Sequence, residues 1–470
     1  MSNKVKTIIK NFSYTIIANF VSFLISVLLI LVVPKIIGIQ EYGYWQLYLF
    51  YSLYVGFLHF GWADGIYLRY GGSEYKELNK KTFFSQFYSL AFFQILIGIL
   101  FVSFTLQFTS NVDRMFILYM LAGYLVLINL RYMLLYILQA TNRMKESAKI
   151  TIIDRILYFI IIVVFLILGE HNYKLLIVVD LFCKLVSLIY AMYCCKEIVF
   201  QKYTSFSFDF NETIENIKAG IKLMFATIAS MLILGTVRFG IEQKWSVETF
   251  GKVSLALSIS NLFMTFINAI SVTLFPLLKR TNENNLNNIY EALRTLLMVV
   301  LFGVLIVYYP LSTLLFSWLP QYHDTFVYMI FIFPLCIYEG KVSLLINNYL
   351  KVIRREKVLM YMNIMIMLLS VCTTFITVAV LENLNFAVLS IIILLSLRCM
   401  VLELQLSRIL KIKVGKDIFL EFIMTFIFIS SAWFFTSFSS FIIYVISFFL
   451  YIVLRKKDIS KSIQSIRQLV

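Results

Sequence analysis

The stretch IIANFVSFLISVLLILVV (residues 16–33) decides the fold class. It contains no charged side chain, and a helix needs about 20 mainly apolar residues to cross the roughly 30 Å hydrocarbon core of a bilayer. Comparable runs recur along all 470 residues, of which 61% are hydrophobic, whereas soluble domains are typically about 45–50% apolar. Membrane-spanning β-strands are instead about 10 residues of alternating polarity. The sequence therefore predicts an all-α protein that crosses the membrane many times.

Apolar runs bounded by polar turns predict about fourteen transmembrane helices. The first run follows three lysines, as in a secretory signal peptide, but it is too long and no small-residue cleavage site follows, so we expect it to remain as a span. The expected ranges are 12–38, 44–68, 83–106, 115–138, 150–168, 174–195, 219–240, 250–275, 291–315, 325–349, 358–380, 386–408, 418–435 and 437–454.

Lysine and arginine are distributed unevenly over the segments that connect these helices. If the N-terminus is cytoplasmic, the inner segments hold 29 of them and the outer loops hold 3, namely Arg114, Lys174 and Lys244. Short loops rich in positive charge stay on the cytoplasmic side, so both termini are predicted to be cytoplasmic. The same distribution accounts for the net charge of +16. Basic residues spread over eight inner segments favour anionic headgroups as partners and not nucleic acid.

The loops leave no room for a catalytic domain. Outer loops are about 5–10 residues long, and the longest inner segment, 196–218, is too short to bind a nucleotide. The nearest approach to an ATP-binding motif, Gly235 to Gly240, is followed by Ile241 and lacks the lysine that the motif requires. We therefore expect neither enzyme activity nor a cofactor. The function of the protein is expected to be carried out within the membrane.

The chain reads as two related halves. Residues 12–68 and 219–275 each consist of a long helix, a short outer turn and a second long helix, although any two membrane hairpins share much of this pattern. Parallel repeats of this kind place a cavity at their interface, and rocking of the halves alternates access to it. Two further helices form an appended pair expected to face lipid, with Glu421 as their ionisable residue. The predicted divisions are 1–218 (helices 1–6), 219–417 (helices 7–12) and 418–470 (helices 13–14 and a basic tail).

Ionisable side chains at membrane depth are costly, so we expect them to face a polar interior. Cations contributed by both halves would suit an anionic phosphate, while nearby carboxylates would relieve their repulsion or couple transport to Na⁺ or H⁺. The candidate substrate-binding cations are Arg131, Lys184, Lys341 and Arg398, and the candidate coupling or ion-pair carboxylates are Asp64, Asp180 and Glu339.

Local sequence adds detail to these candidates. Asp180 and Lys184 are four residues apart and share a helix face, where they can form a buried pair. Pro334 removes a backbone donor and predicts a bend in the tenth span. Asp154 opens the fifth span and is expected to reach the inner interface. His59 is expected to be a hydrogen-bonded interior residue, and no metal site is predicted.

Four strings in the opening hairpin carry a family resemblance: Pro34-Lys35-Ile36-Ile37-Gly38, Glu41-Tyr42-Gly43, Phe60-Gly61-Trp62-Ala63-Asp64-Gly65 and Arg69-Tyr70-Gly71-Gly72. The hairpin resembles bacterial oligosaccharide and O-antigen flippases of Wzx type, in the multidrug/oligosaccharidyl-lipid/polysaccharide exporter superfamily. The matching strings cover the first 75 residues or so, and the helix count and short loops agree along the rest. No site residue is carried over, because the intramembrane cations follow none of these strings.

The resemblance implies a MATE-like fold of two six-helix lobes around a V-shaped cavity in the bacterial cytoplasmic (inner) membrane. Through it, an undecaprenyl-diphosphate-linked sugar unit for O-antigen, lipopolysaccharide, capsule or exopolysaccharide would pass from the inner to the outer leaflet. The implied partners are this lipid-linked oligosaccharide, membrane lipids and other polysaccharide assembly proteins.

Two other functions are compatible with the sequence. A multidrug or organic-cation exporter of the same superfamily would share the fold but should have a net acidic cavity. A membrane glycan polymerase or glycosyltransferase would need a larger outer loop with catalytic residues than this chain provides.

Overall fold

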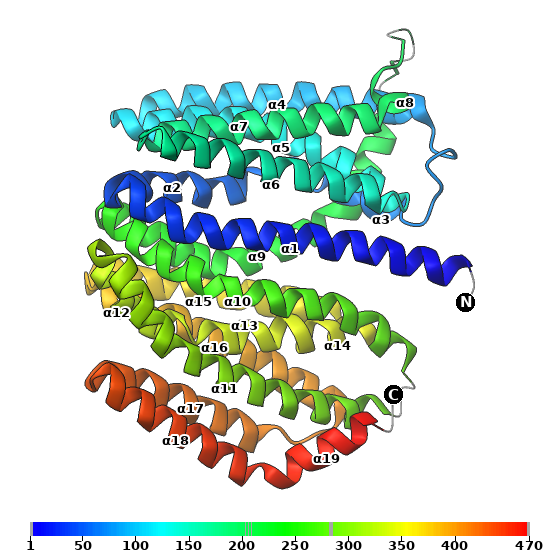
Figure 1. Cartoon of the computed structure of the whole chain (residues 1–470). Helices are drawn as coiled ribbons and strands as arrows, with labels where there is room; N and C mark the ends of the chain where they lie inside the picture. Colours follow the sequence, from blue (N-terminus) through cyan, green and yellow to red (C-terminus); the bar gives the residue numbers. More distant parts are fainter. Residues whose placement is uncertain (1–2, 203, 205, 208, 282–284, 468–470) are drawn as a thin grey trace. The chain divides into compact units, whose positions relative to one another are not determined.

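The computed structural model describes residues 3–202, 204, 206–207, 209–281 and 285–467, and these contain helices and no strands (Figure 1). The chain divides into two compact units, Met1–Ile228 and Ala229–Val470, and α9 runs from one into the other. The first unit contains α1 (Asn3–Ile37), α2 (Ile39–Val55), α3 (Trp62–Arg69), α4 (Lys80–Phe108), α5 (Val112–Ala140), α6 (Met144–Ile167), α7 (Tyr173–Cys194), α8 (Lys196–Val199) and the beginning of α9 (Phe210–Lys244).

The second unit continues from α9 and contains two short π-helical turns, η4 and η5. Its elements are α10 (Val247–Arg280), α11 (Leu286–Trp318), η3 (Pro320–Tyr322), α12 (His323–Ile332), α13 (Leu335–Lys341), η4 (Val342–Ile346), α14 (Asn347–Val352), α15 (Glu356–Thr374), η5 (Phe375–Val380), α16 (Leu384–Leu410), α17 (Gly415–Phe434), α18 (Ser437–Leu454) and α19 (Lys456–Arg467).

Within the described residues, eleven helices are long and apolar enough to span a membrane, and the bent pair 320–332 and 335–352 makes a twelfth candidate. The other two predicted spans correspond to α2 with α3 and to α10. Large apolar side chains such as Phe92, Phe104 and Ile167 are 72%, 61% and 79% exposed, respectively. An outer surface of this kind fits lipid and not water. The predicted all-helical, multi-pass membrane fold is confirmed, and a total of fourteen spans is compatible with it.

Asparagine caps begin several of the membrane helices. The side-chain oxygen of Asn111 accepts hydrogen bonds from the backbone N–H groups of Asp113 and Arg114, each at 3.0 Å. Asn79 and Asn172 cap α4 and α7 in the same way. Such caps satisfy amides that have no partner inside the helix.

The expected continuous span 44–68 is wrong, because the helix breaks between α2 and α3. The turn that connects them has left-handed backbone at Phe60 (φ 52°) and Gly61 (φ 79°). The amide of Gln94 donates to the Leu58 carbonyl at 3.0 Å, and the amide of Asn129 donates to the Val55 carbonyl at 3.2 Å. Non-helical backbone at membrane depth requires such partners, and here buried amide side chains on α4 and α5 provide them.

Three glycines let α3 lie directly against the start of α9. A Cβ added at Gly65 would overlap the Asn216 carbonyl, and one at Gly220 would overlap the backbone of Gly61 and Gly65. A Cβ at Gly61 would come within 2.6 Å of the Ile221 nitrogen. Two glycines of the Phe60-to-Gly65 string are thus explained by helix contact, in which only a residue without a side chain fits.

Polar side chains at the end of α3 also hold this helix against the start of α9. Arg69 donates to Glu212 at 2.8 Å, to Glu215 at 2.6 Å and to Asn216 at 2.6 Å. The Tyr70 hydroxyl donates to Glu212 at 2.6 Å. Burial and this hydrogen bond raise the pKa of Tyr70 to about 12, so the hydroxyl keeps its proton and remains a donor.

In the second unit, Pro334 breaks a span as the sequence predicts. The break separates α12 from α13, and the two halves meet at a bend of 42°. Proline has no backbone N–H and its ring crowds the preceding turn, which accounts for the bend. Directly after Lys341, η4 forms a π-helical turn, a local widening that often accompanies functional side chains.

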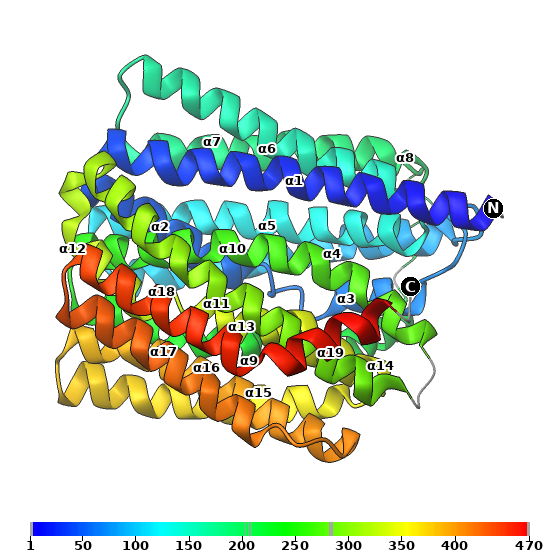
Figure 2. The same cartoon turned by 60° about the horizontal axis from the view of Figure 1, so that its bottom comes forward.

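The C-terminal helices are part of the second unit. Helix α18 packs against α11 and α17, and α19 lies along α11 (Figure 2). The expectation that α17 and α18 form a lipid-facing appendage is wrong at Glu421, which is only 3% exposed. Its carboxylate is held inside the unit by cations from neighbouring helices, as described below.

Candidate functional sites in two charged interiors

In the first unit, Lys184 on α7 lies between two carboxylates. Its Nζ is 2.9 Å from Asp154 Oδ1 on α6 and 3.0 Å from Asp180 Oδ1 on its own helix. The pair predicted from the four-residue spacing is therefore present. The Tyr48 hydroxyl on α2 donates to the other oxygen of Asp180 at 2.8 Å, so three helices share this network.

Arg131 on α5 joins the same network through Asp154, at 3.4 Å. Its Nε is buried and has no hydrogen-bond partner within the described part of the chain. Asp154 is 2% exposed, so its expected place at the inner interface is wrong. Asp154 instead bridges two cations, and with Asp180 the network contains two positive and two negative side chains.

Arg398 on α16 forms a second network across four helices. Its guanidinium donates to Glu339 on α13 at 2.7 Å, and to Asn363 on α15 and Ser230 on α9 at 2.9 Å each. Arg398 is 3% exposed, whereas the Glu339 side chain is 28% exposed. The carboxylate is therefore the accessible member of this pair.

Lys341 belongs to a third network, in the interior of the second unit. Its ammonium pairs with Glu403 on α16 at 2.6 Å and with Glu421 on α17. Arg294 on α11 pairs with the same two carboxylates, at 2.5 Å and 2.6 Å. All four side chains are at most 4% exposed. The group is balanced in charge and closed to solvent, as a buried ion cluster must be to persist.

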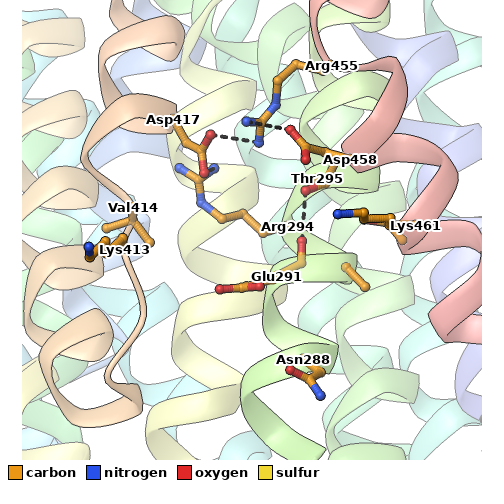
Figure 3. Close-up of a pocket in the computed structure, with 12 residues that line it drawn as sticks. Asn288, Glu291, Arg294, Thr295, Lys413, Val414, Asp417, Arg455, Asp458 and Lys461 are labelled. Atoms are coloured by element: carbon orange, nitrogen blue, oxygen red, sulfur yellow. Dashed lines mark hydrogen bonds and ion pairs between the residues drawn. The ribbon is translucent and has the colours of Figure 1, made fainter.

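The third network continues outward to a pocket of about 320 Å³. Arg294 also contacts Asp417 at 3.0 Å, and Arg455 lies between Asp417 at 2.7 Å and Asp458 at 3.0 Å (Figure 3). Arg294, Asp417, Arg455 and Asp458 all line this pocket. Alternating charges thus connect a fully buried lysine with an open cavity.

Asp64 lies apart from these networks, on α3. The Nε2 of His59 lies 3.6 Å from its carboxylate. The Nδ1 of His59 accepts a hydrogen bond from the Gly61 amide at 3.0 Å. His59 is thus a hydrogen-bonded interior residue, as predicted, and it supports the turn between α2 and α3.

Every predicted cation has a carboxylate partner in this structure, and the seven candidates fall into four separate groups. Three residues of these networks, Glu403, Arg294 and Asn363, were not among the predicted site residues. Glu403 lies within the predicted span 386–408, so the depth criterion that selected Arg398 would have selected it as well. Arg294 lies near the start of its span, where an interfacial position is equally compatible with the sequence.

No protein-family model matches the sequence, and a search of curated proteins found no match either. Among solved structures, the chain resembles the lipid II flippase MurJ in an inward closed conformation, with a TM-score of 0.64 and 13% identity over 95% of this chain and 99% of the flippase. It also resembles an inward-facing multidrug resistance MATE family transporter of the MOP superfamily, with a TM-score of 0.62 and 11% identity over 84% of this chain and 98% of the transporter. A MATE structure in the straight conformation gives 0.55 and 11%. The chain has the fold of these proteins.

Proposed function

We propose that the protein is a transporter of the MOP superfamily that flips lipid-linked oligosaccharides across the membrane by alternating access. The observation that carries the proposal is the extent of the fold likeness, which reaches 95% of this chain with the lipid II flippase but 84% with the multidrug transporter. The likeness to the flippase thus extends over about a tenth more of this chain. The C-terminal segment 418–470 is joined to the second unit by the buried Glu421.

The substrate class rests on the opening hairpin. Its resemblance to Wzx-type flippases supports an undecaprenyl-diphosphate-linked sugar unit, moved from the inner to the outer leaflet of the bacterial cytoplasmic membrane for O-antigen, capsule or exopolysaccharide assembly. The lysine and arginine distribution supports cytoplasmic termini. We further propose that the lobes are 1–218 and 219–417.

Substrate binding would proceed by exchange of ion pairs. A diphosphate accepts several charge-assisted hydrogen bonds, so it can replace Glu339 as the partner of Arg398, or Asp180 as a partner of Lys184. Asp180 and Glu339 are 13% and 28% exposed, which leaves room for such replacement. Lys341 is completely buried and would take part only after a change of conformation. A displaced carboxylate is then available to Na⁺ or H⁺, which would couple transport to an ion gradient.

An organic-cation exporter is the second candidate, and one observation favours it. In the Arg398 and Lys184 networks the more accessible charge is negative, at Glu339 and Asp180, and an organic cation would bind there. The charges in each network are balanced, so the sign of the interior does not separate the two functions. The predicted short outer loops favour neither membrane polymerase nor glycosyltransferase activity.

Transport by the purified protein in proteoliposomes tests the proposal. Arg398→Gln and Lys184→Gln should each slow the movement of a lipid-linked oligosaccharide by about tenfold or more, because each removes a charge-assisted contact of about 1.5–3 kcal/mol. Lys252→Gln is the matched control, since Lys252 pairs with the exposed Asp324. Export of cationic dyes that is abolished by Glu339→Gln, with no movement of lipid-linked sugar, would instead establish the second candidate.

A further inference from the structure

Three tyrosines in the first unit form a row of rings across α3 and α5. The rings of Tyr132 and Tyr136 on α5 are nearly parallel, with an interplanar angle of 12° and centroids 6.1 Å apart. The ring of Tyr67 on α3 lies 5.6 Å from that of Tyr136. Tyr132 is seated against Gly56, where an added Cβ would be 3.3 Å from the ring. We call Tyr67, Tyr132 and Tyr136 the tyrosine platform.

The platform is accessible, and its hydroxyl groups have no partner within the described part of the chain. Tyr67 is 40% exposed, and Tyr132 and Tyr136 are half-buried. None of the three hydroxyls makes a hydrogen bond to another described residue. A tyrosine hydroxyl both donates and accepts, so each of them is able to bond to a ligand in either sense.

A carboxylate lies beside the platform. Asp64 precedes Tyr67 by three residues on α3, and its carboxylate is within electrostatic range of the Tyr136 hydroxyl. The Asp64 side chain is 15% exposed, and its separation of 3.6 Å from His59 is longer than a hydrogen bond. The site thus combines aromatic rings with hydroxyl and carboxylate groups at their edge.

This composition does not suit a lipid-facing surface. Helix α5 packs against α2, α3, α4, α6 and α7, so it is enclosed by other helices of the unit. Tyrosines of an interfacial aromatic belt lie instead on the outer side of a membrane protein. Polar groups without partners are also costly in hydrocarbon. We therefore expect this face to meet a polar ligand.

From this arrangement we propose that the tyrosine platform and Asp64 bind a pyranose ring of the carbohydrate, an inference that rests on the proposed function. The C–H groups on the face of a pyranose pack on the negative face of an aromatic ring. The sugar hydroxyls reach the tyrosine hydroxyls and donate to the Asp64 carboxylate at the edge. An organic cation is typically enclosed by an aromatic cage, whereas two of these rings are nearly parallel and do not surround a charge.

The platform adjoins one of the charged networks. Arg131 directly precedes Tyr132 on α5 and contacts Asp154, which also pairs with Lys184. In a lipid-linked oligosaccharide the diphosphate is bonded to the first sugar. A diphosphate bound at the Lys184 network therefore brings the first sugars close to the tyrosine platform.

The test compares two lipids that differ only in the sugar. Undecaprenyl diphosphate, bare or carrying one N-acetylglucosamine, is presented in equal amounts to the full-length protein in nanodiscs. Native mass spectrometry then measures the ratio in which the protein retains the two lipids. Because both lipids carry the diphosphate, the contributions of Lys184 and Arg398 cancel in this ratio.

Tyr136→Leu is the main variant, because Tyr136 contacts both other rings of the platform. Tyr136→Phe keeps the ring and removes the hydroxyl, and Asp64→Asn keeps the size of the side chain and removes its charge. The matched control is Tyr119→Leu, which changes a half-buried tyrosine of α5 outside the platform.

The wild-type protein should prefer the glycosylated lipid by about tenfold, because stacking on one aromatic ring contributes about two- to tenfold in affinity. Tyr136→Leu should reduce this preference to about twofold or less, and Tyr136→Phe should retain most of it. Asp64→Asn should reduce it by about threefold or more, since a charge-assisted hydrogen bond becomes a neutral one. Tyr119→Leu should leave the ratio unchanged.

Three results would overturn the proposal. They are a wild-type ratio near one, an equal loss of preference in Tyr136→Leu and Tyr119→Leu, and competition by a cationic dye that Tyr136→Leu abolishes while the sugar has no effect. Movement of the lipid-linked oligosaccharide in proteoliposomes is measured separately. Absence of movement with an intact sugar preference would refute the proposed function alone, and movement with a ratio near one would refute the tyrosine platform alone.

Discussion

Glu421 offers the sharpest test of the charged interior, through the change Glu421→Gln. Glutamine keeps the shape of the side chain but removes its negative charge. The cluster of two cations and two carboxylates would then be left with one uncompensated positive charge, on Arg294 or Lys341, at sites at most 4% exposed. Removing one partner of a buried ion pair costs about 3–5 kcal/mol. We expect the lower end, about 3 kcal/mol, because Arg294 retains Asp417 as a third partner.

The measurement is the free energy of unfolding, from denaturant titration in mixed micelles. Asp458→Asn is the matched control, since the Asp458 side chain is 49% exposed and exposed ion pairs contribute about 1 kcal/mol or less. Adding Lys341→Met to Glu421→Gln restores the charge balance, so the double variant should recover most of the loss. If Glu421→Gln costs no more than Asp458→Asn, the cluster is hydrated and the reasoning is wrong.

Three further predictions concern the fold. Gly65→Ala should destabilise the protein by about 2–3 kcal/mol, because the added methyl group overlaps α9. The control Gly98→Ala meets only ordinary contact distances and should be neutral or slightly stabilising, so equal melting temperatures of the two variants would refute the close contact. Asn129→Ala should lower the free energy of unfolding by about 1–3 kcal/mol and speed the hydrogen exchange of residues 56–61, because it removes the donor to the Val55 carbonyl. Unchanged exchange in these residues would contradict this role. Lys244→Ala breaks an exposed pair and should change stability by less than about 0.5 kcal/mol, and a larger loss in the same titration would show that this pair is not solvated.

The length of the apolar runs was sufficient to predict the helices that can span the membrane. It failed at the break between α2 and α3 because residues 56–60 are themselves mostly apolar, so hydropathy continues across the turn. The donors that stabilise the turn, Gln94 and Asn129, are distant in sequence. The polar residues that stabilise this break therefore lie on other helices, and the sequence around the break does not contain them.

The charged sites show the same limit. The pair of Asp180 and Lys184 was predictable because both lie on one helix, four residues apart. The pairing of Asp154 with Lys184, and of Glu421 with Arg294, depends on which helices are neighbours, and a single sequence does not contain that information. Helix α19 escaped prediction because it is short and polar, and its apolar residues are too few for a hydropathy criterion.

The glycine contact between α3 and α9 has a mechanical consequence. Helix α9 runs unbroken from Phe210 to Lys244, and the boundary between the two units falls within it. One helix therefore contributes residues to both units. The segment around Gly220, in the first unit, is held against α3 by backbone contacts at Gly61 and Gly65, and a side chain at any of the three glycines would separate the two helices.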